Sequence, residues 1–387
     1  MSFNKLNLLL ALLLLAGSAA AATPAAVGEY EKTYSETFNV NNDGTVNLTN
    51  RYGRIEVETW EKDQVKIDVR LVVTADDEDD ANRVFDKVRI TFSKGPNTAT
   101  AVTTIDGGNK SNKGWLRKLL DGDYFSYSSS SSRDYKVIYR VRMPAGADLN
   151  TDARYCDVTL PDLSGSVTVK VAYGKLGAGD LTGRCDLDGS YGAIRVGQLG
   201  NDSRLRVRYC DGNEVRRAQD LRYDGRYSET EFGTVGRVEI DAGYDEIEVR
   251  KATEIRFDGN YNSLEIGEVG RFFFDGNYSD LEVESVTEEL EVDAAYGDVE
   301  VDALHENFRR VYVRVSYSDV NIRTGSLSGV DLELRTRYGD IGMPSDVRNV
   351  NRESSGSSRS VIGRVTGSKN RGRIDITTSY GDIELSR

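Results

Sequence analysis

The chain has 387 residues, and its 63 Asp and Glu outnumber its 50 Lys and Arg, giving a formal net charge of −13 at pH 7. A chain of this length can bury a large core. Its acidity argues against nucleic acid or an anionic membrane surface as partner, because both attract clustered Lys and Arg. His305 is its single histidine. Most histidine metal sites and the Ser-His-Asp type of triad are therefore excluded unless His305 carries the site alone.

Residues 1–22 are predicted to be a secretory signal peptide. Lys5 precedes an apolar run at 8–15, and small residues at 16–22 suit a cleavage region. The run is short for a membrane span, and no second run of spanning length follows. We therefore expect an exported mature chain without a transmembrane segment, located in the periplasm, on the outer cell surface or outside the cell.

Residues 23–144 are expected to hold N-terminal strands, a capping helix and the first repeat. Alternation at 65–73 predicts a strand, as it does near 88–92, 98–105 and 135–143. Residues 76–88 predict a helix with an acidic first turn and one apolar face. Such a helix would cover the open end of a stack of strands. Residues 106–133 are rich in Ser and Gly and predict a mobile loop.

From residue 145 to 344 the chain repeats itself around a tyrosine. The tyrosines recur at steps of 17, 18 or 21 residues, and the last step, of 42, is twice 21. The surrounding text repeats as well: Tyr244-Asp245-Glu246-Ile247-Glu248-Val249 matches Tyr296-Gly297-Asp298-Val299-Glu300-Val301. We interpret these tyrosines as a structural ladder. They are Tyr155, Tyr173, Tyr191, Tyr209, Tyr227, Tyr244, Tyr261, Tyr278, Tyr296, Tyr317, Tyr338 and Tyr380.

Within each unit the apolar residues alternate with polar ones, which indicates two short strands separated by turns. A unit of about 20 residues without a helix cannot bury its own core and must stack on its neighbours. The sequence therefore predicts an all-β, single-chain parallel β-solenoid. Because parallel crossovers prefer the right hand, a right-handed β-helix is favoured.

Residues 345–372 interrupt the repeat and predict a flexible loop rich in Ser, Gly and Arg. This loop would account for the double step before Tyr380, and residues 373–387 would form the last coil. Its basic residues would either contact anionic glycans or serve as a solubilising insertion. They are Arg348, Arg352, Arg359, Arg364, Lys369 and Arg371, with Arg373 following.

The repeat signature resembles a bacterial family of candidate adhesins, which are β-strand-repeat proteins of unknown function related to auto-transporter adhesin head domains. The resemblance rests on the Tyr-Gly-Asp-Ile-x-Val pattern, on its start near Tyr52 with Trp60, and on Met143-Pro144-Ala145-Gly146 before the repeats. It covers roughly residues 38–387. It implies a right-handed β-helix outside the cytoplasm with an adhesive or surface role, and it supplies no catalytic residues.

Two acidic columns follow from the repeat, at two and four residues after the tyrosine. Because they alternate with apolar residues they should face outward, where like charges about 4.8 Å apart repel. They predict either a weak Ca²⁺ or cationic-partner surface or a solvated strand face that keeps the rod soluble. The first column holds Glu229, Glu246, Asp280, Asp298, Asp319 and Asp340, and the second holds Glu231, Glu248, Glu265, Glu282 and Glu300.

The tyrosine ladder has two interpretations. Exposed rings would form a stacking platform for sugars, whereas rings at a bend would be a structural corner. Glycine follows the tyrosine in several units, as at Gly174, Gly297 and Gly381, and we expect it to supply a positive φ there.

The remaining candidates point away from catalysis. Cys156 and Cys210 occupy equivalent slots three units apart, too far for a disulfide, and Cys185 lies in an inward register. His305 falls in a lengthened loop. Carboxylates are too numerous for their spacing to indicate a glycosidase.

We therefore expect a non-enzymatic, exported, adhesin-like or envelope scaffold protein that needs no cofactor, unless its acidic face takes Ca²⁺. Its partner would be an unidentified surface glycan or protein. The alternative is a polysaccharide-active lyase or glycosidase, which rests on fold analogy alone.

Overall fold

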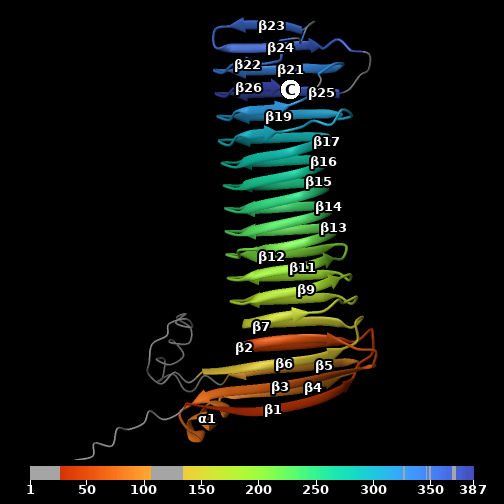
Figure 1. The fold of residues 1–387 in the computed structure, drawn as a ribbon, viewed down its shortest axis with the longest axis vertical. Coiled ribbons are helices and arrows are strands. Elements are labelled where there is room, and N and C mark those ends of the chain that lie inside the picture. Colours follow the sequence, from red (N-terminus) through yellow and green to blue (C-terminus); the bar gives the residue numbers. More distant parts are fainter. Residues whose placement is uncertain (1–26, 106–133, 326, 346, 348–349, 368–371) are drawn as a thin grey trace, which may run out of the picture.

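The computed structural model describes residues 27–105, 134–325, 327–345, 347, 350–367 and 372–387. Over these residues the protein is all-β and mostly parallel, with 26 strands in one continuous hydrogen-bonded sheet. The strands run across a long column, and chain order follows its axis for most of its length (Figure 1). The expected signal peptide and the predicted loop at 106–133 lie outside the described residues.

The N-terminal end of the column is a mixed sheet beside a short helix. Its strands β1 (Gly28–Asn39), β3 (Gln64–Ala75) and β6 (Asp134–Met143) pair antiparallel, as do β4 (Val88–Gly95) and β5 (Thr98–Ile105). Strand β2 (Thr45–Thr59) lies parallel to β5 and β6, and it also pairs with the first strand of the column. It therefore joins both groups of strands to the column.

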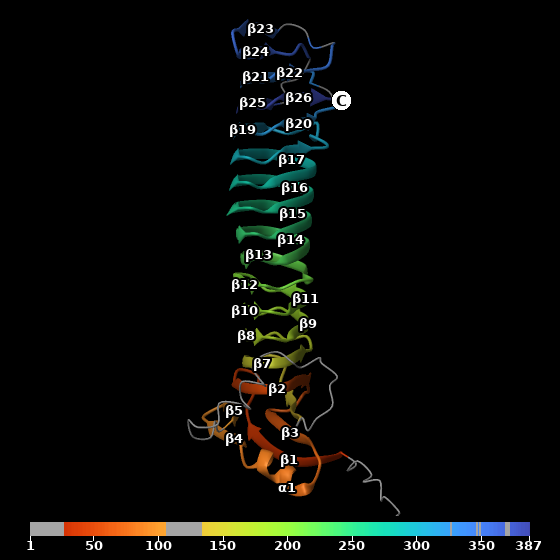
Figure 2. The same ribbon diagram turned by 90° about the vertical axis from the view of Figure 1, so that its left-hand side faces the viewer.

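The helix α1 (Glu78–Phe85) packs against β3 at this end (Figure 2). Asp77 caps it by accepting a hydrogen bond from the Asp80 amide at 2.7 Å, and its first turn is acidic. Carboxylates there interact favourably with the positive end of the helix dipole. Ala81 and Phe85 of the helix are buried. Within the described residues no helix has the length and hydrophobicity needed to cross a membrane.

Each repeat, from one tyrosine to the next, forms one layer of the column. Its strands pair in parallel with those of the layers before and after, and equivalent residues face each other. In chain order the strands of the layers are β7 (Asp148–Leu160), β8 (Val167–Ala172), β9 (Lys175–Leu181), β10 (Cys185–Ser190), β11 (Ala193–Leu199), β12 (Ser203–Arg208), β13 (Asn213–Arg226), β14 (Glu229–Gly243), β15 (Glu246–Asn260), β16 (Ser263–Asn277), β17 (Asp280–Ala295), β18 (Val299–Val301), β19 (Arg310–Ser316), β20 (Val320–Arg323), β21 (Val330–Arg337) and β22 (Ile341–Gly342).

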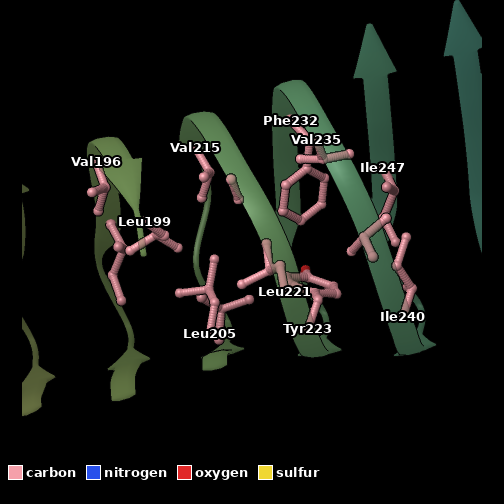
Figure 3. Close-up of a cluster of buried hydrophobic side chains, with 14 of the residues drawn as sticks. Val196, Leu199, Leu205, Val215, Leu221, Tyr223, Phe232, Val235, Ile240 and Ile247 are labelled. Carbon is pink, nitrogen blue, oxygen red and sulfur yellow. The ribbon is translucent and has the colours of Figure 1, made fainter. Parts of the chain in front are cut away.

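The core runs the length of the column as stacked apolar residues. Val196, Val215 and Phe232 follow one another in register on one side. On the opposite side Leu205, Tyr223 and Ile240 do the same, as Figure 3 shows. The rings of Tyr223 and Phe232 meet edge to face, with centroids 5.4 Å apart. Every layer therefore depends on its neighbours to cover its apolar side chains.

The middle layers differ from the prediction of two short strands per unit. In β13 to β17 one continuous strand of 14 to 16 residues spans the whole unit. Its alternation slips where the strand bends: Arg250 and Lys251 are exposed in succession, and Glu254 and Ile255 are buried in succession. The strand bends around the core at these slips, without a separate turn.

The C-terminal segment does not end the column as expected. Strand β25 (Gly372–Ser379) pairs in parallel with β19 on one side and β21 on the other, and β26 (Ile383–Ser386) lies between β20 and β22. The prediction that residues 373–387 form the last coil is therefore wrong, because they lie between two layers that precede them in the chain. The segment fits here because it repeats the alternation of its neighbours, with Ile374 and Ile376 fully buried.

The prediction of a flexible loop at residues 345–372 is also wrong for the part of it that the structure describes. Strands β23 (Val350–Ser355) and β24 (Ser358–Arg364) form an antiparallel hairpin, and β24 pairs antiparallel with β21 at the far end of the column. Ser355 and Ser358 face each other across a two-residue loop in which Gly356 has φ +58°. Because glycine tolerates that angle, the chain can reverse in a tight hairpin within this polar segment.

Candidate binding surface

The repeat tyrosines form one unbroken stack of rings. Successive ring centroids are 4.7–5.1 Å apart, and ring planes deviate by at most 15°. Tyr52 of β2 extends the predicted ladder to thirteen members and closes it against Tyr135, edge to face at 5.5 Å. At the other end Tyr380 lies between Tyr317 and Tyr338, following the layer order and not the chain order. We call these thirteen residues the tyrosine column.

Every tyrosine of the column has a left-handed backbone, with φ between 52° and 63°. The expectation that the following glycine supplies the positive φ is wrong, since Gly174, Gly297 and Gly381 are not in that region. Those glycines serve close approach instead: a Cβ on Gly174 would lie 2.1 Å from the Cys156 carbonyl oxygen. A left-handed non-glycine residue costs about 1–2 kcal/mol. Ring stacking worth about 0.5–1.5 kcal/mol per pair offsets that cost.

The rings are half exposed, but only at their edges. Eleven of the thirteen tyrosines keep 42–52% of their surface accessible. Inside the column each ring has a neighbour on both faces, so what faces solvent is a row of ring edges and hydroxyl groups. None of these hydroxyls has a hydrogen-bond partner among the described residues. Stacking of sugars on ring faces is therefore blocked within the column.

Behind the tyrosines of the middle layers runs a buried polar column, formed by the residues that follow Tyr227, Tyr244, Tyr261 and Tyr278. Ser228 accepts a hydrogen bond from the Cys210 amide at 3.1 Å, and Asp245 accepts from Ser228 at 2.9 Å. Asn262 in turn accepts from the Asp245 amide at 2.9 Å, and Ser279 accepts from Asn262 at 3.0 Å. Each side chain thus satisfies a buried amide of the preceding layer, as buried polar groups require.

Several aspartates two positions after the tyrosine also accept a backbone hydrogen bond from a neighbouring layer. Asp280 accepts a hydrogen bond from the Asp298 amide at 3.2 Å, and Asp298 accepts from Asp319 at 2.9 Å. Asp382 of the inserted segment continues the chain, accepting at 2.7 Å from the Asp340 amide. Their carboxylates therefore hold adjacent layers together along the exposed edge.

The glutamates four positions after the tyrosine lie in register across successive layers and face outward. Glu231, Glu248, Glu265, Glu282 and Glu300 are aligned, and Arg250 pairs with Glu231 at 2.8 Å. In the described part of the chain no group of three or more acidic, His or Cys side chains is arranged to hold a metal ion. Calcium binding by Glu229, Glu246 and the other acidic candidates stays a prediction.

A groove that sequence reasoning missed crosses the layers from β8 to β15. It consists of three hollows of about 300, 390 and 260 Å³, and Arg222 lines all of them. Arg184 and Arg204 line it beside Arg222 and have no ion-pair partner among the described residues. Arg222 pairs with Glu239 at 3.2 Å. Only the layer register brings these side chains together, because they are up to 55 positions apart in sequence.

The other sequence candidates have ordinary environments. Cys156, Cys185 and Cys210 are free and buried. The His305 ring nitrogen Nδ1 accepts a hydrogen bond from the Asn307 amide at 3.2 Å in an exposed turn.

Of the predicted Arg-rich loop, Arg359 pairs with Asp340 at 2.6 Å. Arg364 holds Asp331 through two hydrogen bonds, at 2.7 and 2.8 Å. These arginines tie the hairpin to the column. Arg348, Lys369 and Arg371 lie outside the described residues.

No family model matches the sequence, and no curated protein matches it. Among solved structures, a candidate adhesin from Parabacteroides merdae is 10% identical with a TM-score of 0.29, and the match covers 73% of this chain and 97% of that one. A candidate lipid binding protein from Parabacteroides distasonis is 11% identical with a TM-score of 0.28, over 92% and 97% of the two chains. A candidate cell adhesion protein from Clostridium sporogenes is 10% identical with a TM-score of 0.20, over 92% and 99%. At this distance the names describe those proteins, and the function of this chain has to be argued from its own surface.

Proposed function

We propose that this protein is an exported, non-enzymatic, adhesin-like rod that binds an external glycan or protein along its tyrosine column. The observation that carries the proposal is the continuous row of half-exposed rings. Half the surface of a tyrosine side chain is about 100 Å², so eleven such residues expose about 1,000 Å². Part of this surface belongs to the hydroxyl groups, and the ring-edge carbons supply the remainder. That remainder is comparable to the largest apolar patch of an ordinary monomer, about 300–600 Å², and patches of this size are often functional.

The choice of residue supports an interaction role for the column. Gly or Asn would adopt the left-handed backbone at lower cost. Buried aromatic residues would serve stability better than rings with free edges. A partner that contacts the row would use ring edges and phenol hydroxyls, which repeat at the layer spacing of about 4.8 Å. Such a row suits an extended partner with its own regular repeat.

The test uses Tyr→Phe substitutions, which remove hydroxyls and keep the stack. Full-length protein with Phe at Tyr209, Tyr227 and Tyr244 is compared with wild type on a glycan array and on immobilised extracellular proteins. We expect wild-type binding to a member of these panels, weakened at least tenfold by the triple substitution. Tyr312→Phe, which lies away from the tyrosine column, is the matched control and should bind as wild type does. Equal binding by all three proteins would reject the tyrosine column as the binding surface.

We further infer that the stacked layers make a right-handed β-solenoid whose N-terminal segment directs export. The layer-by-layer parallel register supports the solenoid, and the right-handed preference of parallel crossovers supports its hand. An experimental density map would show the hand directly. Fractionation of cells expressing the whole chain would test export, and protein found only in the cytoplasm would contradict it.

The groove at Arg222 favours a second candidate function, a polysaccharide-active enzyme. It brings Arg184, Arg204 and Arg222 next to Asp202, Asp220 and Glu239, the acid, base and cation that such chemistry uses. Turnover assays on anionic and neutral polysaccharides would decide. Product formation that Glu239→Gln abolishes would support this function, and binding without product would support the adhesin-like one.

A further inference from the structure

The segment Gly372–Ser386 occupies a layer that lies out of chain order. Strand β25 pairs with β19 through seven residues and with β21 through eight, and β26 lies between β20 and β22. Within the described residues, β21 and β22 make no strand pairing with β19 and β20. The last layer before the hairpin is therefore joined to the rest of the column through this segment, which we call the guest strand.

The tyrosine spacing identifies β21 as the layer that would follow β19 without the guest strand. Tyr296 and Tyr317 are 21 residues apart and stack directly on each other. Tyr317 and Tyr338 are also 21 residues apart, yet Tyr380 separates them, with ring centroids 4.7 Å from each. The chain between Tyr317 and Tyr338 is thus long enough for one ordinary layer step.

A row of charged residues independently indicates that β21 would follow β19 if the guest strand were absent. Along one side of the column, acidic and basic residues alternate from layer to layer, which places opposite charges next to each other. The alternation fails at one step only, where Arg310 of β19 faces Arg373 of the guest strand. Without the guest strand, Arg310 would face Asp331 of β21 and the alternation would be complete. The row is Asp220, Arg237, Glu254, Arg271, Glu289, Arg310, Arg373 and Asp331.

The contacts that hold the guest strand do not depend on which chain it comes from. Ile376 lies between Val313 and Leu334 in the core, as any layer would. Asp375 pairs with Arg314 at 3.0 Å, and the Thr378 hydroxyl donates to the Ser318 carbonyl at 3.2 Å. All of these groups are supplied by the strand itself and by the two edges of the slot.

We propose that the slot between β19/β20 and β21/β22 is a strand-binding site, and that its guest, Gly372–Ser386, exchanges with the same segment of a second copy of this chain. Ladder hydrogen bonds provide affinity, and the alternating Ile, Thr and Leu side chains provide specificity, as in other cases of strand addition. A reciprocal exchange keeps every contact, because each copy fills the slot of the other. A one-sided exchange is disfavoured, because the tethered segment competes at an effective concentration in the millimolar range.

The exchange is tested with two full-length chains that each carry one new cysteine. Arg314 and Thr377 face each other in register across β19 and β25. Neighbouring strands lie about 4.8 Å apart, within the Cα separation of a disulfide. Chains with Arg314→Cys and with Thr377→Cys, carrying different tags, are mixed, incubated or unfolded and refolded together, and oxidised. Exchange predicts a disulfide-linked heterodimer that contains both tags.

The matched control uses a layer step that has no guest strand. Asp293 and Arg314 face each other across β17 and β19, which belong to two layers that are successive in the chain. Mixed Asp293→Cys and Arg314→Cys chains should give at least tenfold less heterodimer. A synthetic peptide covering residues 372–386 should suppress the Arg314–Thr377 heterodimer, whereas the same peptide with Ile376→Asp should not.

One further variant separates a failed exchange from a failed fold. A single chain with both Arg314→Cys and Thr377→Cys should form the bond internally, which shows that both cysteines are tolerated. If this internal bond forms and the mixed chains give no more heterodimer than the control, the proposal is overturned.

Discussion

The hydroxyl of Tyr223 donates a hydrogen bond to the carboxylate of Asp245 at 3.2 Å in the protein core, linking β13 to the turn between β14 and β15. Asp245 is 3% exposed, and a Cβ on Gly225 would lie 1.8 Å from its Oδ2. Burial raises the pKa of Asp245 from 3.8 to about 6, while the Ser228 amide, the Tyr223 hydroxyl and Arg226 oppose the rise and Asp224 adds to it. The core therefore holds a carboxyl group that is more stable when neutral.

We expect Asp245→Asn to remove a pH dependence of stability. Because the folded pKa is above the unfolded one, the contribution of neutral Asp245 is complete below about pH 4 and is lost as pH rises through about 6. Relative to the variant, the wild-type free energy of unfolding should fall by about 1–3 kcal/mol between pH 4 and pH 7. Asn262, in the same slot of the next layer, shows that an amide fits. Denaturant titrations at several pH values measure the difference.

The control for this experiment is Asp258→Asn, an exposed carboxylate on the outer face of β15. Its pH profile gives the effect of removing an exposed carboxylate. A parallel profile for wild type and Asp245→Asn would contradict the assignment of the buried titration to Asp245.

Substitutions at Tyr261 should separate ring stacking from backbone strain. Its φ is 63°, and its ring stacks on Tyr244 at 4.8 Å and on Tyr278 at 4.9 Å. Tyr261→Ala loses both stacks and keeps the strain, which we expect to cost about 1–3 kcal/mol. Tyr261→Gly also loses the stacks but relieves the left-handed strain, so it should cost less than Ala. Guanidinium unfolding gives the order, and a more stable Ala variant would show that the strain is negligible.

The repeat could be predicted from the sequence because the regular spacing of its tyrosines and apolar residues is visible without a structure. Tyr155 to Tyr338 recur at nearly constant steps, and the apolar alternation between them has period two. A unit that cannot close its own core has to stack on its neighbours. The tyrosine ladder and the outward acidic columns therefore follow from the local sequence of each unit. The left-handed tyrosine could not be predicted this way, because residue preferences assign that angle to the glycine that follows.

The features that sequence reasoning missed depend on which layer meets which. The order Tyr317, Tyr380, Tyr338 is invisible to a periodicity count, since the 42-residue step equals two ordinary ones. The groove at Arg222 arises because Arg184 and Arg204 belong to neighbouring layers, and their spacing in sequence does not differ from that of other arginines. One signal was available for the missed hairpin: Gly356 within a run of serines between two short strands.

The three cysteines should be unreactive in the native protein. Burial raises the pKa of Cys156 to about 12 and that of Cys185 to about 11, and it also raises the pKa of Cys210. Since the thiolate is the reactive form, native protein at pH 8 should react with a thiol reagent at least a hundredfold more slowly than unfolded protein. Unfolding without a reductant should then release three thiols per chain. Fewer than three would reveal a disulfide and contradict the free, buried state.

Glu254 should be among the most sensitive carboxylates of the column. It is 4% exposed and lies within ion-pair distance of three arginines: Arg256 at 2.8 Å, Arg271 at 2.5 Å and Arg237 at 3.6 Å. Glu254→Ala removes the carboxylate shared by these part-exposed arginines, of which Arg237 keeps Asp220 at 3.7 Å, and we expect a loss of about 1–3 kcal/mol. Glu268→Ala is the matched control in the next layer. Its carboxylate is exposed and pairs with Lys251 at 3.0 Å, so the loss should be about 1 kcal/mol or less. Equal losses in thermal and denaturant unfolding would mean that burial does not distinguish the two glutamates. A loss at Glu254 that shrinks in high salt would confirm that the lost ion pairs are its cause.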